Sequence, residues 1–189
     1  MTTDQISALF TRSDGSFLCA RWGRPVAPVI FGLADESLDI FRAAIRAGYA
    51  HAGHAIAETD PESGANLLVF VCRDWDELDG IPDLDLLTGL DDLPARLAGR
   101  DHYQMMRFDK SGAIRACLSF LRVGGAFADT HPAQLAEMVA MRSTLSFAAQ
   151  VTPSAELALL IRAAYAPVLP SLATDPAHAY RLAARLGVA

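Results

Sequence analysis

Lysine, cysteine and clustered basic residues are scarce in this sequence. Lys110 is the only lysine, and the other fifteen basic residues are arginines that occur singly. We therefore expect no nucleic-acid binding, which needs a basic patch with interleaved aromatic side chains. The three cysteines, Cys19, Cys72 and Cys117, lie far apart and form no Cys-x-x-Cys pair. A disulfide framework and a zinc ribbon are therefore not expected either.

Long apolar runs are also absent. No run reaches the roughly 18 residues that a membrane-spanning helix needs, so no membrane association is expected. The N-terminal residues MTTDQISALFTRSDG include two acidic residues before the first glycine and no basic start. We expect no signal peptide there, and we expect a soluble, cytoplasmic protein.

The local motifs of several large enzyme classes are missing. The sequence contains no G-x-x-x-x-G-K-[ST], no G-x-G-x-x-G and no G-x-S-x-G. Gly124 and Gly125 form an isolated pair that is typical of a flexible turn. The sequence therefore predicts no catalytic residue and no cofactor, and it leaves open whether the chain is an enzyme.

The composition is that of a folded protein of one domain. The chain has 189 residues, of which 52% are hydrophobic, and this length suits a single core over residues 1–189. The order of the expected elements predicts an α+β fold. We expect a mostly antiparallel sheet of four to six strands, with a central hairpin at 103–121, packed on N-terminal and C-terminal helices.

The hairpin is the clearest local signal. Two strand-like stretches, 103–108 and 113–121, flank Asp-Lys-Ser-Gly, in which Gly112 can supply the positive φ of a type I turn with a bulge. The continuous apolar run at 66–73 predicts a strand that is buried on both faces. Further strands are expected at 16–21, 26–31 and 55–58, and helices at 3–11, 35–51 and 132–149 and from Pro153 and Pro176 onward.

Two histidines, His51 and His54, are the candidates for a metal site. With Glu58 and Asp60 nearby they offer two imidazoles and a carboxylate. The alternative is a helix C-terminus, where histidine interacts favourably with the helix dipole and Gly53 ends the helix. The sequence between them favours termination, so we predict no metal.

Acidic residues are concentrated in one segment. Eight of the 22 acidic residues fall between Asp74 and Asp92. They belong to an excursion at 74–101 that we expect to be ordered and partly helical, and we call its acidic part, residues 74–92, the acidic segment. Its spacing fails for a calcium loop, which needs glycine at position 6 and glutamate at position 12. The segment is then a solvated edge of the fold or a surface that meets a basic partner.

The expected helix at 132–149 contains Ala136-Glu137-Met138-Val139-Ala140, in which alanines stand where a zinc peptidase has histidines. Without these ligands Glu137 has no metal-bound water to deprotonate. A metal site is not expected in this helix, and chance and a degenerate peptidase helix both stay open.

Arg142 lies on the apolar face of the same helix, which poses an electrostatic problem. A guanidinium group cannot be buried without a partner. Three outcomes stay open: the side chain extends to water, it pairs with a buried carboxylate, or it binds an anionic ligand in a pocket. Arg107 and Arg115 of the hairpin are the possible companions in such a pocket.

Three stretches, RWGRPVAPVIFG, AETDPESGANLLVFVCRDWDEL and MRFDKSGAIRACLSFLR, resemble a family of uncharacterised bacterial proteins. The resemblance covers residues 10–125 and implies no activity. The order of elements is similar to that of small zincin-like domains, with the metal motif absent. Our first expectation is a non-catalytic binding or adaptor protein that engages a protein partner or itself. The alternatives are a hydrolase-like enzyme and a small-anion-binding protein with a pocket around Arg142.

Overall fold

The computed structural model describes residues 1–187 and is built on a four-stranded sheet. Its strands follow the order β2 (Pro28–Phe31), β3 (Leu67–Cys72), β5 (Ile114–Arg122) and β4 (His102–Phe108). The pairs β2–β3 and β3–β5 are parallel, and β4–β5 is antiparallel. A separate two-stranded sheet pairs β1 (Cys19–Ala20) with β6 (Leu172–Ala173) in antiparallel orientation.

The α+β class is confirmed, but the expected sheet pattern needs a correction. The four-stranded sheet is mixed rather than mostly antiparallel, and the hairpin is not central, because β4 is an edge strand. Parallel strands need long crossover connections, which leave no local signal in the sequence. Here the segment containing helix α2 (Asp35–Ala52) connects β2 to β3, and the segment containing the acidic residues connects β3 to the hairpin.

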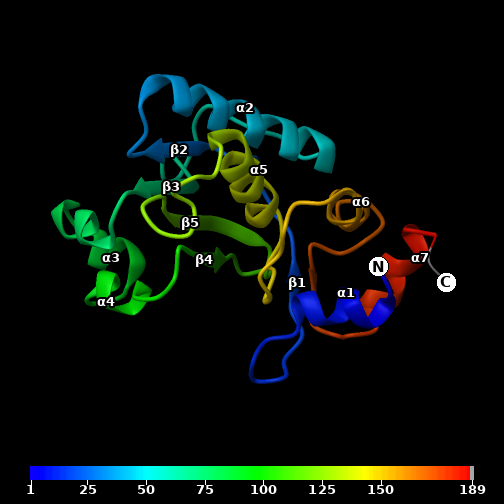
Figure 1. Cartoon of the computed structure of the whole chain (residues 1–189). Coiled ribbons are helices and arrows are strands. Elements are labelled where there is room, and N and C mark those ends of the chain that lie inside the picture. The colour runs from blue at the N-terminus through cyan, green and yellow to red at the C-terminus, as the bar shows by residue number, and fades with distance from the viewer. Residues whose placement is uncertain (188–189) are drawn as a thin grey trace.

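Helices cover both faces of this sheet (Figure 1). On one face lie α2 and α5 (Pro132–Ser143), which pack on each other and on the inward side chains of β3 and β5. On the other face the 3₁₀ helix η1 (Trp75–Gly80) and the short helices α3 (Leu84–Thr88) and α4 (Leu93–Leu97) enclose a second core. The strand β3, which was predicted at 66–73, is therefore buried on both faces as expected.

A row of aromatic side chains crosses the sheet on the face of α3 and α4. Phe31, Phe70, Phe120 and Tyr103 are register partners on the four neighbouring strands. The ring centroids of Phe31 and Phe70 are 5.0 Å apart, as are those of Phe70 and Phe120. Aromatic neighbours on one face are among the strongest cross-strand pairs, so this row fixes the register of all four strands.

A third core lies beside the sheet and joins the two ends of the chain. It is formed by α1 (Thr3–Phe10), α6 (Ala155–Ala164) and α7 (His178–Arg185), with Phe10 and Leu182 fully buried within it. Helices α1 and α7 pack against each other (Figure 1). Among residues 1–187, every helix is too short or too polar to span a lipid bilayer.

A helix was predicted at 132–149, but the observed helix α5 is shorter and ends at Ser143. Its last carbonyl groups accept hydrogen bonds from side chains that are distant in the sequence. Trp22 Nε1 and the Tyr49 hydroxyl donate to the Ser143 carbonyl at 2.7 and 3.0 Å, and the Tyr165 hydroxyl donates to the Thr144 carbonyl at 2.7 Å. These donors satisfy the carbonyls that a longer helix would have bonded internally.

Two expected strands are also shorter than predicted. Within 16–21 regular pairing covers Cys19–Ala20, and within 55–58 Ile56 forms an isolated bridge with Val26. The hairpin turn agrees with the prediction, because Gly112 has a φ of 81°.

Candidate functional site

Arg142 lies in the last turn of α5, where its guanidinium group reaches the edge strand β4. It is half-buried, and its bonded partners are neutral groups. Nε donates to the Val151 carbonyl at 2.9 Å, and Nη1 lies 2.8 Å from Nδ1 of His102. Burial lowers the pKa of Arg142 from its ordinary value. The helix thus holds a charged group in place without neutralising it.

His102 is the residue that fixes this geometry. Arginine can only donate hydrogen bonds, so Nδ1 of His102 must be the acceptor. Nε2 then carries the proton and donates to the Ser119 hydroxyl, 3.2 Å away on β5. Burial, together with the charge of Arg142, lowers the pKa of His102 to about 3. His102 is therefore a neutral imidazole at physiological pH, and it contributes no charge of its own.

A polar pocket of about 170 Å³ opens beside Arg142. Its wall includes Arg100, Tyr103, Gln104 and Gln150. The Gln104 amide nitrogen donates to the carbonyl of Arg142 at 3.2 Å and to the sulfur of Cys117 at 3.0 Å, which leaves its oxygen as an acceptor. The side chain of Arg100 is exposed and makes no hydrogen bond within residues 1–187. The pocket therefore brings together two arginines and several uncharged polar groups.

The buried carboxylate that was one possible partner of Arg142 is not found. Within residues 1–187, no aspartate or glutamate forms a salt bridge with Arg142 or Arg100. Asp101, next in sequence to Arg100, is bound to Arg122 instead, through a 2.6 Å contact. Arg142 is therefore left with neutral partners and with the pocket beside it.

Arg107 and Arg115 do not join this pocket. Arg107 is on β4, but it is an odd number of residues from His102 and Gln104, so it faces the opposite side of the sheet. There it donates to the Thr88 carbonyl at 2.6 Å. Arg115 is exposed on β5 and pairs with Glu62 at 3.1 Å. The three arginines of the hairpin and α5 therefore lie at three separate places.

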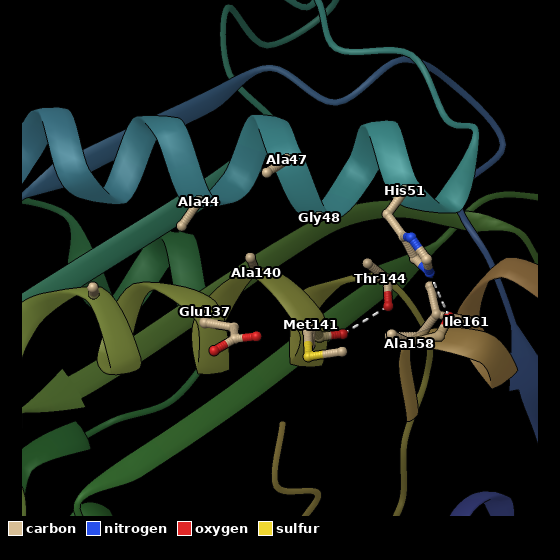
Figure 2. A pocket seen from close by; sticks show the side chains of 11 residues that line it. Ala44, Ala47, Gly48, His51, Glu137, Ala140, Met141, Thr144, Ala158 and Ile161 are labelled. Carbon is tan, nitrogen blue, oxygen red and sulfur yellow. Dashed lines mark hydrogen bonds between the residues drawn. The ribbon is translucent and has the colours of Figure 1, made fainter. Parts of the chain in front are cut away.

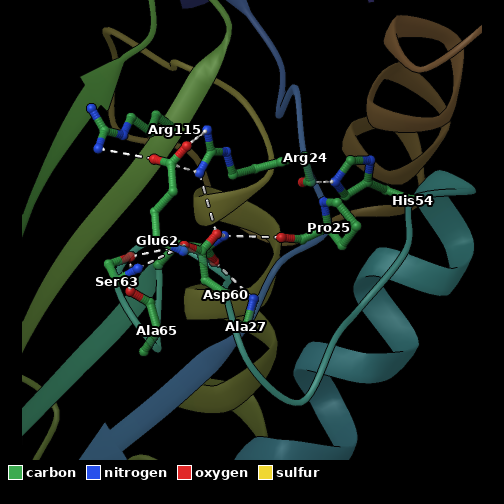
Figure 3. A network of polar contacts seen from close by, with 10 residues as sticks. Arg24, Pro25, Ala27, His54, Asp60, Glu62, Ser63, Ala65 and Arg115 are labelled. Atoms are coloured by element: carbon green, nitrogen blue, oxygen red, sulfur yellow. Dashed lines mark hydrogen bonds and ion pairs between the residues drawn. The ribbon is translucent and has the colours of Figure 1, made fainter.

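Arg115 belongs to a polar network that fastens the loop before β3 (Figure 3). Arg24 bridges Glu62 and the buried carboxylate of Asp60, at 3.0 and 3.4 Å. Burial raises the pKa of Asp60, but hydrogen bonds from the Glu62 and Ser63 amides, the Ser63 hydroxyl and Asn66 outweigh it and lower the pKa to about 2. Every charge in this network has an opposite partner, so we assign it to the fold.

The candidate metal ligands His51 and His54 are held in different places. His51 is at the C-terminal end of α2, and its Nε2 donates to the Ala158 carbonyl on α6 at 2.9 Å. His54 lies beyond the helix, and its Nε2 donates to the Arg24 carbonyl at 2.8 Å (Figure 3). No group of three or more histidine, cysteine, aspartate or glutamate side chains suited to a metal ion is present in the described residues.

The Ala-Glu-x-x-Ala stretch of α5 has a packing explanation. Ala136 and Ala140 are buried, and a Cβ atom placed on Gly48 of α2 would lie 3.2 Å from the Cβ of Ala140. Small residues at these positions let the two helices approach closely. Larger histidines would not fit against α2, so the face that a peptidase turns to its cleft is here part of the core.

A groove of about 460 Å³ runs beside this contact, between α2, α5 and α6 (Figure 2). Small residues make up about half of its lining, and Glu137 of α5 and His51 of α2 are its ionisable side chains. Within the described residues no hydrogen bond or salt bridge joins Glu137 to His51, whose Nε2 is bonded to the Ala158 carbonyl instead.

His102, Gln104 and Arg100 were missed in the sequence. A signal for two of them exists, because His102 and Gln104 are polar residues at alternate positions of β4, on the face that carries Met106 and Phe108. Polar residues on the helix-facing side of a strand need partners.

Comparison of the chain with protein-family models, curated proteins and solved structures finds no match.

Proposed function

We propose that this chain binds a small anion, with a carboxylate or phosphate group, in the pocket beside Arg142. One observation carries the proposal: a half-buried guanidinium group is held by neutral acceptors alone and faces a pocket with a second arginine. A buried charge without a counter-charge is costly, and a bound anion removes that cost.

The orientation of Arg142 suits this role. A guanidinium group has five N–H donors in a planar fork, and the bonds to Val151 and His102 use one donor on Nε and one on Nη1. The second N–H of Nη1 and both N–H groups of Nη2 remain as donors to the oxygens of a carboxylate or phosphate. The bond to neutral His102 restrains the fork without competing for the anion. Arg100 adds a second positive charge at the mouth of the pocket.

The hydrolase-like alternative gains no support from this pocket. A general base needs a free lone pair, and Nδ1 of His102 is occupied by Arg142 while Nε2 donates to Ser119. We therefore propose binding rather than catalysis. The volume of about 170 Å³ suits inorganic phosphate or a carboxylic acid of a few carbon atoms.

Ligand titrations followed by thermal unfolding test the proposal. Phosphate, sulfate and a series of small mono- and dicarboxylates are compared with sodium chloride at equal ionic strength. We expect at least one anion to raise the melting temperature, since a ligand at 100 times its Kd stabilises a protein by about 2.7 kcal/mol. Arg142→Gln should abolish this increase. Arg100→Gln should weaken the affinity about tenfold, and the fold should tolerate it because the side chain of Arg100 is exposed.

Arg107→Gln is the matched control, because it removes an exposed arginine on the opposite face of the same sheet. It should leave the response to anions unchanged. The proposal is wrong if no anion exceeds the effect of chloride, or if Arg142→Gln folds and responds as the unmodified chain does.

We propose protein docking as a second candidate function, in line with the first expectation from the sequence. The observation that favours it is a set of exposed large apolar side chains, Phe31 on the edge strand β2 and Leu86 and Leu87 on α3. Exposed apolar clusters of this kind are typical of surfaces that bind other proteins.

A further inference from the structure

The edge strand β2 presents an incomplete aromatic row to solvent. Phe31 is the last member of the row that crosses the sheet, and its ring stacks on Phe70 with 17° between the ring planes. The side chain of Phe31 is nevertheless 43% exposed. One ring face is thus covered by the sheet, and the row ends at an open edge.

An apolar pocket of about 420 Å³ lies beside this edge. We call it the β2 pocket, and its apolar wall is formed by Phe31, Leu68, Phe70, Leu78, Ile81 and Leu87. Leu87 of α3 is 42% exposed, and its neighbour Leu86 is 77% exposed. The pocket and the exposed leucines form a surface large enough for one bulky side chain and its flanking residues.

Most of the charged residues near the β2 pocket are acidic, although Arg96 and Arg107 each donate to a backbone carbonyl of the acidic segment. All eight acidic residues of the acidic segment are exposed, and none of them forms a salt bridge within residues 1–187. One of them, Glu77, stands in the wall of the pocket. This excess of negative charge attracts cations and repels nucleic acid and anionic membrane surfaces.

We infer that the β2 pocket docks a segment of a partner protein that carries one large apolar side chain flanked by lysine or arginine residues. The apolar side chain enters the pocket beside Phe31 and extends the aromatic row. The basic residues lie over the acidic segment and speed association. This inference rests on docking, the second proposed function, and it adds the chemistry of the partner.

Selection from a library of random peptides of about twelve residues tests the inference on the intact protein. The enriched peptides should combine an excess of lysine and arginine with one phenylalanine, tryptophan or leucine. A fluorescent selected peptide should bind at least tenfold more weakly to Phe31→Ser and to Leu87→Ser. Its affinity should also fall in Asp76→Asn/Asp79→Asn/Asp85→Asn, with a shallower dependence on salt.

Val168→Ser is the matched control, because Val168 is an exposed aliphatic residue outside the β2 pocket. It should bind the peptide as the unmodified chain does. Selected peptides that need Phe31 but carry no excess of basic residues would overturn the partner chemistry and leave docking intact. If no peptide is enriched, or if binding ignores both Phe31 and Leu87, docking at the β2 pocket is refuted as well. Anion binding at Arg142 is measured separately and is unaffected by either result.

Discussion

At the residue scale, the charge of Arg142 stays without a counter-charge because its bonded neighbours, His102 and the Val151 carbonyl, are neutral. His102 is 8% exposed and lies against a guanidinium group, so protonation would place a second charge at the same spot. The sequence identifies Arg142, because an arginine on an apolar helix face needs a partner. It cannot identify His102, which is 40 residues away and meets Arg142 only once β4 lies along α5.

His102 predicts how stability depends on pH. The pKa of His102 is about 3 in the folded chain, whereas a histidine in an unfolded chain has a pKa of about 6.5. Between these two pH values the unfolded state binds the proton and the folded state does not. Stability is therefore complete above pH 6.5 and is lost as the pH falls towards 3. From pH 7 to 4.5 the loss from this residue should be about 2–3 kcal/mol.

Urea unfolding of the unmodified chain and of His102→Gln at both pH values measures this contribution. Glutamine can accept from Arg142 and donate to Ser119, but it does not titrate in this range. The variant should lose less stability on acidification than the unmodified chain. An equal loss in both proteins would show that His102 is protonated in the folded state.

At the element scale, the sequence predicts what local chemistry determines. The hairpin was predicted because its turn and both strands lie within about twenty residues of one another, and β3 because an apolar run needs no partner to be recognised. The end of α5 was placed too late, because its carbonyls are bonded by Trp22, Tyr49 and Tyr165. The parallel pairings were missed for the same reason, since their partners are far apart in the chain.

The hairpin turn allows a matched test of glycine. Gly112 and Gly15 have nearly equal φ values of 81° and 82°, so alanine at either position should cost about 1 kcal/mol through the backbone. A Cβ atom at Gly112 would also collide with the side chain of Leu172, whereas nothing lies within 4 Å of one at Gly15. In urea unfolding, Gly112→Ala should therefore be more destabilising than Gly15→Ala. Equal losses of stability would show that contact with Leu172 does not restrict this turn.

At the scale of the whole molecule, the two ends of the chain are part of one core. Composition gives no sign of this, because α1 and α7 are short and lie more than 160 residues apart. In the folded chain they pack together and close the cluster around Phe10 and Leu157. The chain must therefore bring its two ends together before this cluster is complete, at a loop-closure cost that grows only slowly with length.

Because α7 packs into this core, truncating a buried residue of α7 should lower the free energy of unfolding as much as truncating a residue in the middle of the chain. Leu182 is 0% exposed in α7, and Leu182→Ala should lower the free energy of unfolding by about 2–5 kcal/mol. Tyr180 stands in the same helix with 67% of its side chain exposed, and Tyr180→Ala should change it by about 0.5 kcal/mol or less. Urea unfolding of both variants checks the contrast. Similar small changes in both would mean that α7 is not joined to the core, because a frayed helix loses nothing when its inner leucine is shortened.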